Sequence, residues 1–154
     1  MNVQSLETTR RRVGLYRETM LAAGHDEQAV AANLRHSWVW RNVFVAATDA
    51  EAERIGVPAF ETMTLARAEM RNRVFAETGR RIAVPHSDLP GSRTARGDGL
   101  IYGSTASVAK DFAALDQLGI GGVIGTFRLG PMPHEVAAAS LSLFLREVAP
   151  QFRH

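Results

Sequence analysis

The chain has 154 residues, of which 45% are hydrophobic and 22% are charged, and it contains no cysteine. This composition is typical of a globular domain with a buried core, and it excludes disulfides and cysteine-ligated metals. The formal net charge of only +2 and the lack of an apolar run of about 18 residues argue against a broad nucleic-acid footprint and a transmembrane helix. Residues 1–5 lack a signal-peptide pattern, so we expect a cytoplasmic protein without nucleic-acid or membrane partners.

The first third of the sequence predicts two helices. Apolar residues recur there at helical spacing, at Leu6, Val13, Tyr16 and Met20. Ser5 can cap a helix over Ser5–Ala23, and Gly24 can end it. A second, shorter helix is expected over Glu27–Leu34. Arg10–Arg12 is the densest basic run, and we interpret it as the solvated face of a helix in preference to a phosphate-binding patch.

The middle of the chain predicts a strand followed by a long helical region. Ser37–Ala46 is short and rich in β-branched and aromatic residues, which favours a buried parallel strand. Thr48 or Asp49 can then cap a helix that starts at Ala50. We expect this helix to break near Gly56–Pro58, to resume, and to end at about Glu77. The stretch Arg80–Gly99 has no clear period, and a loop of that length is often functional.

The last third predicts a helix, a strand and a final helix. Leu100–Ser104 leads into a helix with Val108, Phe112 and Leu115 on its apolar face, and Gly121–Leu129 is expected to form the second strand. A last helix begins near Pro133 and is expected to stop at Pro150. Two separated strands joined by helices indicate an α/β protein with a parallel pairing and a right-handed crossover. Two strands do not make a complete sheet, so the sequence is expected to be a piece of such a protein.

Four phrases of the sequence resemble the luciferase-like, flavin-dependent monooxygenase and oxidoreductase family. They are Val43–Ala52, Tyr102–Val108, Gly119–Glu135 and Ser140–Phe152. The family's closing phrase, Phe-x-x-Glu-Val-x-Pro, is matched by Phe144, Glu147, Val148 and Pro150. Thr105 and Ala106 depart from the Pro and Glu that usually begin the family's helix after Gly-Ser or Gly-Thr.

The resemblance implies that residues 1–154 form a single partial domain, the C-terminal part of a (β/α)8 TIM-type barrel. The chain would supply two parallel strands, their flanking helices and a helical insertion. It implies a monooxygenase that uses dioxygen and reduced FMN, supplied by a flavin reductase, to oxidise a small organic substrate; a deazaflavin is used in relatives. The alternative is an inactive remnant or a half-barrel that associates with itself or with a missing N-terminal portion.

In such barrels the chemistry lies at the carboxyl ends of the strands. Arg128 follows the second predicted strand beside a Gly-Pro turn, where it could face an anionic flavin or substrate. The alternative is a surface or ion-paired arginine. Ser104, with the Gly103 amide, opens a helix that could hold a phosphate or carboxylate, and the alternative is a plain N-cap. We therefore list Arg128, Ser104 and Gly103 as candidate cofactor-binding residues.

Trp40 and the long loop supply the candidate substrate or lid residues. Trp40 shares a strand face with Trp38, where the two could line a substrate or pack against helices. Arg80, Arg81 and His86 could close over an anionic ligand, because the family carries a mobile segment at this place in the chain. The alternative is a disordered loop. Arg41 points to the other strand face and is expected either to enter the barrel centre or to pair with a carboxylate such as Asp49 or Glu51.

The sequence gives no candidate metal site. None of the five histidines has the spacing of a metal-binding pair, and the His-Glu-x-x-His motif is absent. We expect no metal, and the catalytic residues are not identified by any motif.

Overall fold

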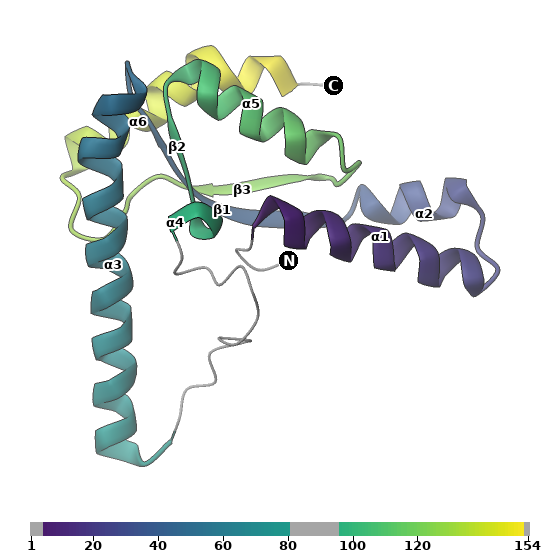
Figure 1. The fold of residues 1–154 in the computed structure, drawn as a ribbon, viewed down its shortest axis with the longest axis horizontal. Helices are drawn as coiled ribbons and strands as arrows, with labels where there is room; N and C mark the ends of the chain where they lie inside the picture. Colours follow the sequence, from purple (N-terminus) through teal and green to yellow (C-terminus); the bar gives the residue numbers. More distant parts are fainter. Residues whose placement is uncertain (1–4, 81–95, 153–154) are drawn as a thin grey trace.

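The computed structural model describes residues 5–80 and 96–152, which form three strands surrounded by helices (Figure 1). The strands are β1 (Trp38–Val45), β2 (Leu100–Gly103) and β3 (Gly122–Thr126). The helices are α1 (Leu6–Ala22), α2 (Glu27–Leu34), α3 (Asp49–Thr78), α4 (Arg96–Gly99), α5 (Thr105–Asp116) and α6 (His134–Leu143). A π-helical turn (Phe144–Val148) and a 3-10 turn (Ala149–Phe152) continue α6. No helix of the described residues combines the length and the apolar character needed to cross a bilayer.

The three strands form one parallel sheet in the order β2-β1-β3. β1 pairs with β3 from Trp38–Gly122 to Asn42–Thr126 and with β2 from Asn42–Leu100 to Val45–Gly103. The predicted parallel pairing of the two long strands is therefore confirmed. The expected number of two strands is wrong, because Leu100–Gly103 adds a third strand of four residues, which is too short to show a period of two in the sequence.

Helices cover both faces of this sheet. Alternate β1 residues point to opposite faces. Val39, Val43 and Val45 pack against α1, α2, α5 and the π-helical turn, whereas Phe44 packs against α3. In a (β/α)8 barrel, successive strands lie side by side and the helices form one outer ring. The α/β class is confirmed. β1 and β3, the two strands predicted to belong to a barrel, lie side by side, and the barrel itself stays a prediction.

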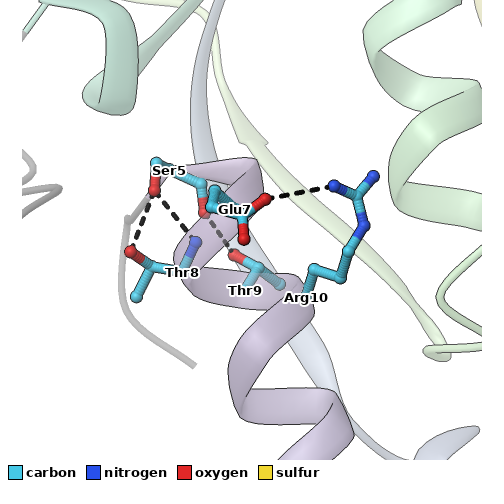
Figure 2. A network of polar contacts seen from close by, with 5 residues as sticks. All are labelled: Ser5, Glu7, Thr8, Thr9 and Arg10. Carbon is cyan, nitrogen blue, oxygen red and sulfur yellow. Dashed lines mark hydrogen bonds and ion pairs between the residues drawn. The ribbon is translucent and has the colours of Figure 1, made fainter.

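A network of hydroxyl groups fixes the start of α1 (Figure 2). The Thr8 amide donates to Ser5 Oγ at 3.0 Å, which confirms Ser5 as the N-cap, and the Thr9 hydroxyl donates to the Ser5 carbonyl at 2.9 Å. An exposed ion pair of 3.2 Å joins Arg10 to Glu7 one turn later. Thr9 is buried. The network therefore fixes the Thr9 hydroxyl group on the face of β1 that α1 covers.

α3 is one continuous helix of 30 residues, with Pro58 inside it. The break expected near Gly56–Pro58 is wrong, because Gly56, Val57 and Phe60 are buried against the sheet and hold the helix across the proline. Thr48 caps the helix by accepting from the Glu51 amide at 3.1 Å, and Gly79 ends it in the left-handed region with φ 66°. Beyond Met63 no residue of α3 is buried, and Figure 1 shows this half running away from the sheet.

Candidate functional site

The carboxyl ends of the three strands lead into the residues that sequence analysis singled out. β1 is followed by Thr48 and Asp49, β2 by Ser104, and β3 by the segment that carries Arg128. In open α/β sheets, ligands bind outside this edge, most often where neighbouring strands send their helices to opposite faces. β1 and β2 are such a pair, because α3 and α5 lie on opposite faces.

Asp49 is exposed at the carboxyl ends of β1 and β2. Its Oδ1 accepts from the Ser104 amide at 2.6 Å, and a Cβ at Gly103 would lie only 2.8 Å from the same oxygen. The Ser104 amide, and then the Ser107 and Ser104 hydroxyls, hold the pKa of the Asp49 carboxyl below its ordinary value. The protein therefore places its own carboxylate at the start of α5.

Ser104 also serves as the N-cap of α5. The Ser107 amide donates to Ser104 Oγ at 3.4 Å. Two amides at the helix start are thus already bonded: the Ser107 amide to Ser104 Oγ, and the Ser104 amide to Asp49 Oδ1. The binding of a cofactor by Ser104 and Gly103 stays a prediction, and any anion there would have to displace Asp49.

Arg128 lies at the rim of an open cavity of about 550 Å³ between α3 and the β3–α6 loop. Its lining includes Met63, Ala66, Arg67 and Met70 of α3, with Arg128, Gly130 and Pro131 of the loop. Gly130 has φ 55°, and a Cβ there would lie 2.8 Å from Met63 Cβ, so the loop and the helix are in direct contact. Within residues 5–80 and 96–152, no ion pair or hydrogen bond engages the side chain of Arg128 or of Arg67.

A second cavity, of about 450 Å³, lies at the end of β1 between α3 and α6. Its walls are apolar except for Glu51, Glu135 and Ser140. Glu51 accepts from the Ala47 amide at 3.2 Å, and Ser140 Oγ accepts from the buried Val45 amide at 2.7 Å. An acidic wall makes this cavity unsuitable for an anion.

Sequence reasoning missed Arg67 and Glu135 as cavity residues. Arg67 lies four residues after the buried Met63 on one face of α3. That spacing could have indicated which face of α3 carries Arg67, although its place on the same cavity as Arg128 depends on the Gly130 contact. Glu135 lies in the first turn of α6, and only the approach of α6 to β1 brings it to a cavity.

Trp40 lies away from the carboxyl edge. It is 40% exposed on the α3 face of the sheet, and its indole Nε1 donates to Thr126 Oγ1 at 2.6 Å. Five residues of strand separate it from Val45, or roughly 16 Å. Trp40 therefore stays a candidate substrate contact in the middle of the sheet.

The expected pairing of Arg41 with Asp49 or Glu51 is wrong, and its entry into a barrel centre stays a prediction. The side chain is 2% exposed on the face covered by α1, where it donates to Thr9 Oγ1 at 2.8 Å and to the Trp40 carbonyl at 2.9 Å. Burial lowers the pKa of its guanidinium to about 10. Asp49 and Glu51 are bonded elsewhere, because they lie beyond the end of the strand.

The structure does not bring Arg80, a candidate lid residue, to this edge. Arg80 is exposed just after the end of α3, where its amide donates to Thr78 Oγ1 at 3.2 Å. Fifteen helical residues separate Thr78 from Met63, or roughly 22 Å. Arg81 and His86 lie outside the described residues.

No family model matches the chain, and no curated protein matches it by sequence. Solved structures do match. The monooxygenase RslO1 from Streptomyces bottropensis is 21% identical with a TM-score of 0.59. The oxygenating constituent of 3,6-diketocamphane monooxygenase from Pseudomonas putida, a type II Baeyer–Villiger monooxygenase in complex with FMN, is 22% identical with a TM-score of 0.53. Each alignment covers 99% of this chain but only 41% and 42% of the other chains. The chain thus shares the fold of about two fifths of these proteins.

Proposed function

We propose that the chain takes part in the flavin-dependent oxygenation of a small organic substrate. The observation that carries the proposal is the fold match over 99% of the chain to two monooxygenases, one of them in complex with FMN. The sequence phrases that resemble luciferase-like enzymes point the same way. When bound, reduced FMN would supply the reaction with dioxygen, and the protein would supply orientation and shielding from water.

The described residues offer only part of a flavin-binding site. Arg128 offers a cation at the carboxyl edge for an anionic group of the flavin or the substrate, and the cavity beside it has apolar walls. The start of α5 does not offer a free phosphate site, because Asp49 lies there. We therefore propose that residues beyond this chain complete the flavin site as part of a barrel, that a separate reductase supplies the reduced flavin, and that a deazaflavin is the alternative cofactor.

A titration of the purified chain with FMN, followed by quenching of flavin fluorescence, tests this proposal. We expect weak but saturable quenching, because the chain provides only part of a site. Riboflavin and a deazaflavin serve as comparison ligands. An absence of saturable quenching up to about 1 mM FMN, an affinity of only about −4 kcal/mol, would contradict the proposal. Submicromolar binding by the chain alone would contradict the view that its site is incomplete.

A second candidate function is that of a non-catalytic half-unit that associates with another chain. The observation that favours it is the exposure of two paired apolar side chains on one sheet face, Trp40 (40%) and Ile124 (56%), with Trp38 (49%) exposed at the start of β1. Among the described residues, β2 and β3 each pair with β1 alone, so both outer edges are open to further strands. Size-exclusion chromatography with light scattering tests this idea, and a clean monomer with a sharp thermal transition would count against it.

A further inference from the structure

We propose that the cavity between α3 and the β3–α6 loop binds an organic anion with a carboxylate head and an apolar body, and that Arg67 and Arg128 hold the carboxylate. The identification of this anion as the substrate rests on the proposed function. The binding itself rests only on the cavity.

The two arginines are carried by segments that are fixed to each other. Gly130 touches Met63 directly, and only a residue without a Cβ allows this approach at φ 55°. Leu129 and Met132 are buried in the same core cluster as Met63. Arg67 lies four residues from the buried Met63, and Arg128 is next to the buried Leu129. A ligand would therefore lose little free energy in ordering the backbone that carries them.

The charge of the cavity favours an anion. Both arginines line it, and none of its described lining residues is acidic. Two guanidinium groups facing one space repel each other, and a carboxylate between them removes this repulsion while it accepts charge-assisted hydrogen bonds. The neighbouring cavity at the end of β1 carries Glu51 and Glu135 instead. An anion should therefore bind in the cavity with the two arginines and not in the acidic one.

The remaining walls favour an apolar body behind the carboxylate. Met63, Ala66, Met70, Gly130 and Pro131 supply them, together with Thr62, whose hydroxyl donates to the Pro58 carbonyl at 2.8 Å. Met70 is 58% exposed. Methionine adapts its shape to varied apolar groups. The volume of about 550 Å³ falls in the usual range of small-molecule sites, roughly 300–1,000 Å³.

A carboxylate fits this cavity better than the phosphate of a flavin. Phosphate sites are usually built from free backbone amides at a helix start or in a glycine-rich loop. α3 contributes residues 62–70 to the cavity, from the interior of the helix, where the amides are bonded within the helix. The two side-chain cations are therefore the main donors on offer.

Binding of octanoate to the purified chain, measured by calorimetry without any flavin, tests the proposal. Octanol keeps the apolar body without the charge, and inorganic phosphate keeps a charge without the apolar body. We expect saturable 1:1 binding of octanoate, with octanol and phosphate each weaker by about tenfold or more. Arg67→Gln and Arg128→Gln should each weaken octanoate binding by about tenfold. Arg73→Gln, an exposed arginine of α3 that does not line the cavity, is the matched control.

Three outcomes would overturn the proposal. The first is octanoate binding no tighter than octanol, and the second is octanoate binding that neither arginine variant weakens. The third is tight FMN binding that depends on both arginines while octanoate does not bind, because the cavity would then serve the flavin phosphate. Thermal melting of each variant verifies that it is folded. Because FMN is titrated separately, a failure of flavin binding with octanoate binding intact would count against the proposed function alone.

Discussion

At the scale of single residues, Asp49 joins the ends of β1 and β2. Its carboxylate accepts from the Ser104 amide, and hydrogen bonds from Ser104 and Ser107 lower its pKa. A carboxyl whose folded pKa lies below its unfolded value of about 3.9 stabilises the fold above that pH. This contribution is lost as the pH falls through the folded pKa.

Asp49→Asn should therefore lower the melting temperature at pH 7, because the amide keeps an acceptor oxygen but loses the charge at the start of α5. The difference from the wild type should shrink as the pH falls below about 4. Thermal denaturation across pH measures both effects, with Glu18→Gln, an exposed position of α1, as the control. A deficit that stays constant with pH would show that the charge of Asp49 contributes nothing.

Arg41 is a buried cation that makes no ion pair with any described residue. Its guanidinium donates to a hydroxyl and a carbonyl, and burial lowers its pKa. Replacing a buried charge by an apolar residue of similar volume is often neutral or stabilising. Thr9 would keep its hydrogen bond to the Ser5 carbonyl.

We therefore expect Arg41→Met to change the free energy of unfolding by less than about 1 kcal/mol, or to raise it. Arg41→Ala should instead cost roughly 2 kcal/mol or more, because it leaves a cavity under β1. Urea denaturation of the two variants measures the contrast. A loss of about 3 kcal/mol in the methionine variant would mean that the guanidinium hydrogen bonds stabilise the fold substantially.

At the scale of elements, two glycines inside helices have opposite surroundings. A Cβ at Gly14 of α1 would meet nothing within 4 Å, whereas a Cβ at Gly56 of α3 would lie 2.7 Å from Phe44 Cδ1 and 3.0 Å from Phe44 Cβ. Phe44 is buried in the core, so its ring cannot simply turn away. The close approach of α3 to β1 thus depends on the missing side chain at Gly56.

Gly14→Ala should stabilise the protein by about 0.5–1 kcal/mol, because alanine loses less backbone entropy in a helix. Gly56→Ala should destabilise it by about 1–3 kcal/mol through overpacking. The two variants differ from the wild type by the same methyl group, so each is the control for the other in chemical denaturation. Equal effects of both substitutions would contradict the close packing of α3 on β1.

The elements differ in how far the sequence predicts them. Helical spacing and capping residues predict α1, α2 and α5 almost to the residue, because each has a cap and an apolar face of its own. β2 and the continuity of α3 are not predicted, since both depend on partners distant in the sequence. The same holds for the candidate site. Arg128 follows a strand that the sequence predicts. Arg67 lines the same cavity only because the loop after β3 packs against α3.

At the scale of the whole molecule, the strand order places β1 at the centre of the sheet. β1 lies between β2 and β3, with α3 on one face and α5 on the other. A right-handed crossover that reverses direction across a sheet places successive helices on opposite faces, as observed here. The alternative is the sequential order β1-β2-β3, in which β2 would lie between the other two strands.

Engineered cysteine pairs can distinguish these two arrangements, because the chain has no cysteine of its own. Trp40 and Ile124 are partners in the observed register of β1 and β3, so their Cα atoms lie about 4.8 Å apart, within the range of a disulfide. In the sequential order β1-β2-β3, β2 would separate these strands, and the spacing would double to about 9–10 Å, beyond that range. We expect the Trp40→Cys/Ile124→Cys variant to form an intramolecular disulfide on mild oxidation, seen as a mobility shift on a non-reducing gel. The Val43→Cys/Ile101→Cys pair of β1 and β2 is adjacent in both arrangements and serves as the positive control. Oxidation of the control pair alone would favour the sequential order β1-β2-β3 over the sheet described here.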